Sequence, residues 1–165
     1  MQPAELEFQA EYDLPLAIVW DALVDEVLVE GWLASARIEP RIGGLYWLDW
    51  QSGANLAPTN GTITVFDEPA GGDLATLQVD TDNIGTLRFV LESEPGGTRG
   101  STTRVSLSIR VDTDPRLLAS TRAYWLNNFD QLDDLLHGKP VDWANWQRDH
   151  GAAWEAYRGD ASGAN

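Results

Sequence analysis

The sequence contains no cysteine and only two histidines among its 165 residues. The missing thiols exclude disulfide scaffolds, thiolate zinc sites, iron–sulfur clusters and cysteine nucleophiles. Basic side chains are also scarce, since 11 Lys and Arg residues stand against 26 Asp and Glu residues. The formal net charge of −15 argues against a nucleic-acid partner, because phosphate binding depends on clustered cationic groups.

Long hydrophobic runs are absent as well. No apolar stretch approaches the roughly 20 residues that a membrane-spanning helix requires, and no secretory signal pattern is recognisable. We therefore expect a cytoplasmic protein without a membrane span. The apolar fraction of 43% suffices for one core in a chain of this length. We expect one domain over residues 1–138, a helical extension of it over 139–158 and a flexible tail over 159–165.

Alternation of apolar and polar residues predicts strands in two regions of the chain. The first is short, and its apolar positions are Leu6, Phe8, Ala10 and Tyr12. The second extends from residue 37 to 112 and contains several alternating runs separated by turn signals. These signals are Gly43-Gly44, Asn60-Gly61, Gly71-Gly72 and Gly96-Gly97. The pattern predicts an antiparallel meander with one apolar and one solvated face.

Apolar residues spaced three and four apart predict helices. Two short helices follow the first strand, over about residues 15–33. A long amphipathic helix is predicted between Pro115 and Gly138, where the apolar positions are Leu118, Trp125, Phe129, Leu132 and Leu136. Together these elements indicate an α+β fold in which a curved antiparallel sheet wraps around the long helix.

Several short motifs resemble those of START-like, helix-grip (SRPBCC) proteins. They occupy residues 12–25 (YDLPLAIVWDALVD), 31–34 (GWLA), 39–44 (EPRIGG), 61–69 (GTITVFDEP) and 96–99 (GGTR). The resemblance extends from residue 4 to residue 137 and is strongest to the activator-of-heat-shock-ATPase-like branch. It implies a deep cavity between the sheet and the long helix. Members of the superfamily bind lipids, polyketides or other apolar molecules there, and some act as cyclases or as chaperone-ATPase activators in the stress response.

The inward positions of the predicted elements agree with such a cavity, because they are almost entirely apolar. We predict these residues as its ligand-binding wall: Tyr46, Trp50, Phe89, Leu107, Tyr124, Trp125, Asn128, Phe129 and Leu132. Tyr46, Tyr124 and Asn128 carry polar groups that could orient a ligand. The predicted function is non-catalytic binding of an apolar or aromatic molecule, lipid-like or polyketide-like. The same residues would equally suit a filled core, and the family resemblance favours the cavity.

Two other functions stay open at this point. One is a chaperone-linked or other protein-interaction module in which the predicted cavity is only a filled core. The other is a polyketide cyclase or dehydratase, which would require a buried Tyr, Asp or His with a shifted pKa. We assign no catalytic residue, metal ligand or cofactor, since His137 and His150 stand apart and no nucleotide or nucleophile motif is recognisable.

A stripe of aromatic residues marks the region that follows the long helix. It consists of Trp143, Trp146, Trp154 and Tyr157. We expect this stripe to pack against its own domain or over the cavity mouth, as apolar helix faces usually do. The alternative is a homodimer contact, because aromatic residues are enriched at the centres of interfaces.

Overall fold

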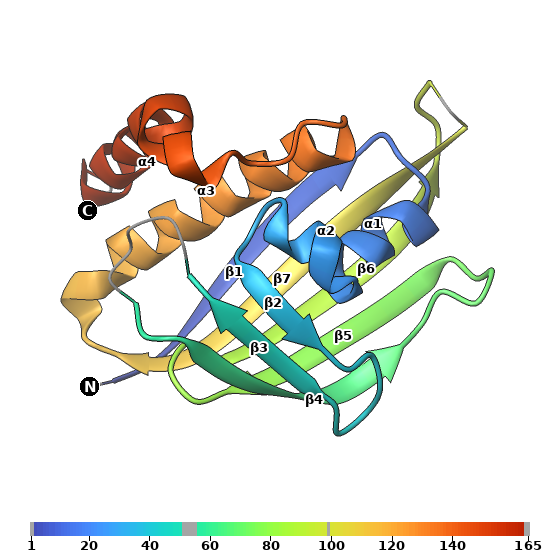
Figure 1. Ribbon diagram of the computed structural model, residues 1–165, viewed down its shortest axis with the longest axis horizontal. Coiled ribbons are helices and arrows are strands. Elements are labelled where there is room, and N and C mark those ends of the chain that lie inside the picture. The colour runs from blue at the N-terminus through green and yellow to red at the C-terminus, as the bar shows by residue number, and fades with distance from the viewer. Residues whose placement is uncertain (1, 51–55, 99, 164–165) are drawn as a thin grey trace.

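One antiparallel sheet curves around a long helix in the computed structural model, which describes residues 2–50, 56–98 and 100–163, without the side chains of 160–163 (Figure 1). Its strands are β1 (Gln2–Tyr12), β2 (Ser35–Ile38), β3 (Leu45–Asp49), β4 (Thr59–Asp67), β5 (Leu74–Thr81), β6 (Thr86–Pro95) and β7 (Ser101–Thr113). The helices are α1 (Leu16–Val24), α2 (Glu26–Glu30), α3 (Leu118–Leu136) and α4 (Trp146–Gly163). Single 3-10 turns, η1 (Pro115–Leu117) and η2 (Trp143–Asn145), precede α3 and α4.

The sheet joins the first strand of the chain to the last. The strand order is β1-β7-β6-β5-β4-β3-β2, and each neighbouring pair is antiparallel. The helices α1 and α2 lie between β1 and β2 in the chain and on the same side of the sheet as α3 (Figure 1). This arrangement confirms the predicted α+β, helix-grip fold.

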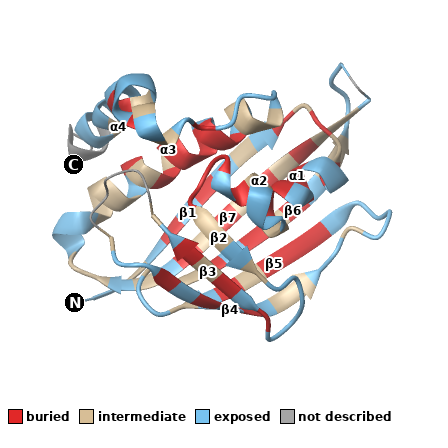
Figure 2. Cartoon of the chain, in the orientation of Figure 1, coloured by how far each residue is buried: buried red, intermediate tan, exposed pale blue. Residues whose placement is uncertain are grey.

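The core lies between the concave face of the sheet and α3 (Figure 2). Alternation places Phe8 and Leu107 opposite each other on this face, and both are buried. On α3, Trp125, Phe129 and Leu132 are also buried, because a spacing of three to four residues keeps them on one side of the helix. The rings of Phe8 and Phe129 are 6.0 Å apart, so β1 and α3 are in direct contact.

The extension after α3 folds back onto that helix and covers its outer side (Figure 1). Residues 159–163, where the sequence predicts a flexible tail, continue the backbone of α4, and residues 164–165 of that tail lie outside the described residues. None of the described helices has the length and hydrophobicity that crossing a bilayer requires.

The turn predicted at Asn60-Gly61 is wrong, because both residues belong to β4. Gly61 lies between two neighbouring strands and pairs with Tyr46 on one side and Thr81 on the other. A Cβ atom at this position would lie 2.6 Å from Cγ1 of Val79 and 2.7 Å from the Tyr46 carbonyl oxygen. The glycine therefore permits close approach of strands, a role that glycine also has within sheets.

Candidate ligand-binding site

A cavity of about 460 Å³ opens where the N-terminal half of α3 meets the end of the sheet. This volume is within the range of small-molecule sites, which is roughly 300–1,000 Å³. Its wall combines residues from β7, α3, α4, the β5–β6 hairpin and the ends of the β3–β4 connection. The lining residues are Trp50, Leu56, Asn83, Ile84, Val111, Thr113, Leu117, Ser120, Thr121, Tyr124, Trp125 and Trp154.

The α3 side of the cavity follows from helical periodicity. Leu117, the last residue of η1, lies four residues before Thr121, and Tyr124 follows three residues later, so the three side chains share one side where the helix begins. Asp114 caps the preceding 3-10 turn by accepting a hydrogen bond from the Arg116 backbone N–H at 2.9 Å. This cap starts the helix directly after β7 and thereby places its first turns beside the end of the sheet.

A chain of hydrogen bonds fixes the sheet side of the cavity. The indole N–H of Trp50 donates to Oγ1 of Thr59 at 2.9 Å, and this hydroxyl donates to Oδ1 of Asn83 at 2.6 Å. The amide of Asn83 donates in turn to the carbonyl oxygen of Ala57 at 3.1 Å. The Trp50 ring meets the Tyr124 ring edge to face at 5.8 Å, so this network also reaches α3. The aromatic wall is therefore held in place before any ligand binds.

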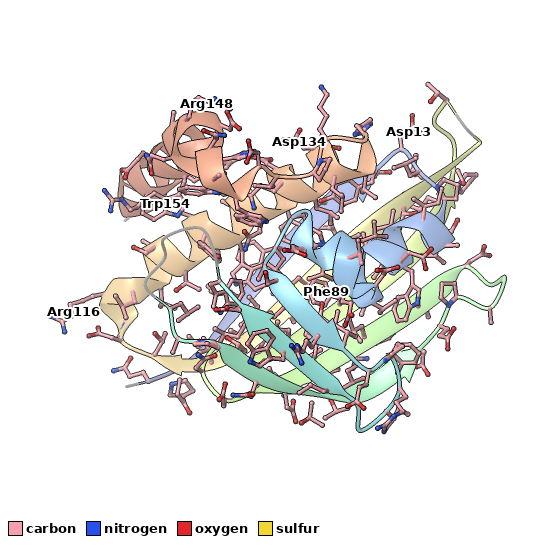
Figure 3. All side chains as sticks on the ribbon, in the orientation of Figure 1. Asp13, Phe89, Arg116, Asp134, Arg148 and Trp154 are labelled. Carbon is pink, nitrogen blue, oxygen red and sulfur yellow. The ribbon has the colours of Figure 1, made fainter. Side chains whose placement is uncertain are left out.

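Helix α4 supplies the remaining side through Trp154 (Figure 3). Two hydrogen bonds attach this helix to α3: Trp146 Nε1 donates to Oε1 of Gln131 at 2.7 Å, and the Tyr157 hydroxyl donates to Oδ2 of Asp130 at 2.6 Å. A third bond, from Trp143 Nε1 to the Glu30 carbonyl oxygen at 2.6 Å, ties the preceding turn to α2. The predicted packing of the aromatic stripe against its own domain thus agrees with these intrachain contacts.

None of the lining residues that the structure describes carries a formal charge. They offer hydroxyl, amide and indole groups for hydrogen bonding, set in a mainly apolar surface. Two other hollows lie on the outer face of the sheet and differ in character, since charged residues such as Glu5 and Arg110 border both. Among the described residues, no three His, Asp or Glu side chains come close enough to hold a metal ion.

The perturbed tyrosines lie outside this cavity. Burial raises the pKa of Tyr46 far above its ordinary value, and burial together with Asp133 and Asp130 does the same to the pKa of Tyr12. The hydrogen bond to Asp130 raises the pKa of Tyr157 to about 12. Each hydroxyl serves a structural contact, since Tyr46 donates to the Leu23 carbonyl oxygen at 2.7 Å and Tyr12 to that of Phe129 at 3.1 Å.

The structure divides the nine predicted wall residues into two groups. Trp50, Tyr124 and Trp125 line the cavity. The other six are buried deeper between the sheet and α3 and are absent from its lining: Tyr46, Phe89, Leu107, Asn128, Phe129 and Leu132. The centre of the domain is thus packed with side chains, while the cavity occupies one end. The part of each residue in ligand binding stays a prediction.

Asn128 belongs to a buried polar cluster on α3. Its Oδ1 accepts from Nε2 of Gln131 at 3.4 Å, and the same Gln131 amide donates to the Trp32 carbonyl oxygen at 2.7 Å. Asn127 joins the cluster by donating to Oε1 of Gln131 at 3.1 Å. This cluster therefore connects α3 to the segment after α2, and through Trp146 to α4.

The sequence did not predict most of the other lining residues as part of the wall. Leu117 and Thr121 could have been found from their helical spacing to Tyr124. Asn83 and Ile84 lie in a short hairpin, where the sequence pattern gives no sign of a role in the cavity. Trp154 was predicted as part of the aromatic stripe, and its place in the cavity depends on how α4 docks.

Comparisons with known proteins agree with this architecture. A family model described as "Activator of Hsp90 ATPase homolog 1-like protein" matches residues 13–137. No curated protein matches the sequence. Among solved structures, CalU16 from Micromonospora echinospora has a TM-score of 0.55 and 20% identity, over 93% of this chain and 88% of CalU16.

Two further solved structures extend the comparison. DynU16, a protein of the dynemicin biosynthetic locus, has a TM-score of 0.59 and 18% identity, over 82% of this chain and 48% of DynU16. EF2215 from Enterococcus faecalis, described as a conserved protein of unknown function, has a TM-score of 0.62 and 14% identity, over 99% of this chain and 88% of EF2215. At these identities the likeness concerns the fold.

Proposed function

The chain belongs to the activator of Hsp90 ATPase homolog 1-like family, and on this premise we propose that it binds an uncharged, apolar or aromatic small molecule in the cavity at the start of α3. The observation that carries the proposal is the composition of the wall, in which three of the eight tryptophans and Tyr124 surround one space, and none of the described lining residues is charged. An ion bound there would lose its hydration without gaining a charged partner among these residues, whereas an apolar molecule would gain free energy from leaving water.

The fixed geometry of the wall supports the same proposal. The hydrogen bonds from Trp50 to Thr59 and from Thr59 to Asn83 hold the Trp50 ring, which packs edge to face against Tyr124, so this part of the wall is ordered without a ligand. A site that is already formed loses less conformational entropy when a ligand binds. CalU16 and DynU16 share this fold, and DynU16 comes from a biosynthetic locus, which is compatible with a small molecule as ligand.

Thermal shift with three uncharged probes tests this function: naphthalene, fluorene and 1-dodecanol. At about 100 times its dissociation constant, a bound probe stabilises the native state by about 2.7 kcal/mol, which raises the Tm by roughly 5–10 °C. We expect such a rise with the aromatic probes, and a rise with 1-dodecanol would extend the ligand class to lipids.

Two tryptophan variants test whether the probes bind in the cavity. Trp50→Ala removes one wall of the cavity, whereas Trp47→Ala is a matched control because Trp47 faces the other side of the sheet. We expect the Trp50 variant to lose the shift and the Trp47 variant to keep it. The proposal is wrong if no probe shifts the Tm, or if both variants retain the full effect.

The family description favours a second candidate, a module that activates an Hsp90-type ATPase. The packed centre of the domain suits this role, because a protein-binding module needs no open cavity. The two functions can be separated by measuring ATP hydrolysis by Hsp90 with and without the protein. An increase that Trp50→Ala leaves intact would support the second candidate over ligand binding.

A cyclase-like reaction has less support from the cavity itself. Its described lining contains Tyr124 as the one side chain with a phenol and includes no carboxylate or imidazole. General acid–base catalysis usually relies on such groups with tuned pKa values. We therefore place binding ahead of catalysis.

A further inference from the structure

Trp154 presents a buried hydrogen-bond donor without an acceptor. Its Nε1 atom is shielded from solvent and makes no hydrogen bond to any of the described residues. Buried indole N–H groups usually have a partner, because an unpaired group loses the hydrogen bond it makes to water in the unfolded chain. Since Trp154 also lines the cavity, a molecule bound there is a candidate for the missing acceptor.

Several other polar groups of the wall are already engaged within the protein. Trp50 donates to Thr59, and Asn83 uses its oxygen for Thr59 and its nitrogen for the Ala57 carbonyl. The Thr121 hydroxyl donates to the Leu117 carbonyl oxygen at 3.0 Å, within the helix. Against these satisfied neighbours, the indole of Trp154 is distinguished as a donor without a partner among the described residues. Because Nε1 is covered, the side chains around it must shift before a ligand atom can reach it.

The position of Trp154 is constrained by the contacts of its helix. Trp146 and Tyr157, on either side of it in the chain, are hydrogen-bonded to α3. The guanidinium carbon of Arg158 lies 4.9 Å from the centroid of the Trp154 ring, in a cation–π arrangement. The indole is thus supported by its own helix and by α3, as a residue that selects ligands must be.

We propose that Trp154 is a specificity-determining residue that donates a hydrogen bond to an acceptor oxygen of the ligand. The inference deepens the proposed function and rests on it. It narrows the ligand class to uncharged aromatic molecules that carry a carbonyl or ether oxygen. It also makes α4 part of the site, although this helix lies beyond residues 13–137, which the family model matches.

A pair of probes with the same shape tests the hydrogen bond. 9-Fluorenone and fluorene share one planar ring system, but only fluorenone has a carbonyl acceptor. One neutral hydrogen bond should make fluorenone bind about fivefold more tightly than fluorene to the full-length protein. Titrations followed by the ¹H–¹⁵N indole resonances give both dissociation constants, and fluorenone alone should shift the Trp154 signal strongly downfield.

Two conservative variants separate the hydrogen bond from a general effect on α4. Trp154→Phe keeps an aromatic ring but removes the N–H, and the loss of its resonance also assigns the Trp154 signal. We expect its preference for fluorenone to fall to about one, while its affinity for fluorene changes less than threefold. Tyr157→Phe disturbs the attachment of α4 but not the cavity wall, and it should retain the fivefold preference.

The outcomes separate this inference from the function on which it rests. If the wild-type protein binds neither probe, the proposed function fails for aromatic ligands and the role of Trp154 fails with it. If both probes bind with equal dissociation constants and shift the Trp154 resonance equally, the proposed function is retained and only the hydrogen bond is refuted. A fluorenone preference that survives in Trp154→Phe also overturns the inference, even where that variant is less stable, because the ratio is measured within one variant.

Discussion

Trp146 and Gln131 form a buried hydrogen bond of 2.7 Å that joins α4 to α3. The same Gln131 side chain donates to the Trp32 carbonyl oxygen at 2.7 Å, so one amide links three separate segments of the chain. Buried groups in such a network depend on each other, because none has water as a replacement partner.

Replacing Gln131 with alanine should therefore be strongly destabilising. The Trp32 carbonyl and the Trp146 N–H both lose a buried partner, and we expect a decrease of roughly 3 kcal/mol in the free energy of unfolding. Urea unfolding followed by circular dichroism measures this change. Gln147→Ala, at an exposed position of α4, is the control and should stay within about 0.5 kcal/mol of the wild type. Equal effects of the two substitutions would contradict the linking role.

Two glycine-to-alanine substitutions should differ in their effects on stability. Gly61→Ala places a Cβ atom against Val79 and the Tyr46 carbonyl, and we expect a loss of about 2 kcal/mol. Gly159→Ala meets no atom within 4 Å and lies in α4, where alanine has the higher helix propensity. It should be neutral or raise stability by up to about 1 kcal/mol. Urea unfolding measures both changes in the free energy of unfolding. A Gly61→Ala variant as stable as the wild type would refute the close strand contact.

Alkaline titration should reveal the bond between Tyr157 and Asp130. Because the folded state raises the pKa of Tyr157 from 10.0 to about 12, this bond stabilises the protein fully below pH 10. Its contribution should then decrease as the pH rises through this interval, where the unfolded state releases the phenolic proton first. The stability difference between the wild type and Tyr157→Phe is therefore expected to shrink between pH 10 and pH 12. A difference that is constant over this range would show that the phenol does not titrate in this way.

Removing the residues after Gly138 tests whether the aromatic stripe packs within its own chain or forms a homodimer contact. The truncated chain loses the contacts of Trp143, Trp146 and Tyr157 with α2 and α3, and we expect its Tm to fall by roughly 5–10 °C. Light scattering should give the same monomeric mass for both forms. A full-length dimer that becomes a stable monomer on truncation would instead support the homodimer alternative.

The fold was predictable from sequence because its signals are local. Alternation in residues 5–12 and 37–112 and the three-to-four spacing after Pro115 each report on one element and on the side it buries. The turn prediction at Asn60-Gly61 was wrong for the same reason. The dipeptide by itself favours a hairpin turn, whereas the need for a glycine at position 61 comes from Tyr46 and Val79 in the neighbouring strands.

The candidate site was less accessible to such reasoning. Alternation shows that Phe89 and Trp50 both face inward, yet it cannot show that other side chains fill the space around Phe89 and leave a cavity beside Trp50. Trp154 was expected in a stripe that packs on the domain or over the cavity mouth, but its exact place in the wall depends on how α4 folds back along α3.

The pairing of the first strand with the last has a consequence for biosynthesis. Gln2 lies opposite Thr113 and Tyr12 opposite Thr103, so β1 has no partner until most of the chain has been made. Such long-range pairing slows folding, because a large loop must close before its contacts form. During translation β1 is therefore a free, half-apolar edge that can pair with other nascent chains. Its outward glutamates, Glu5, Glu7 and Glu11, give this edge a repulsive charge during that interval.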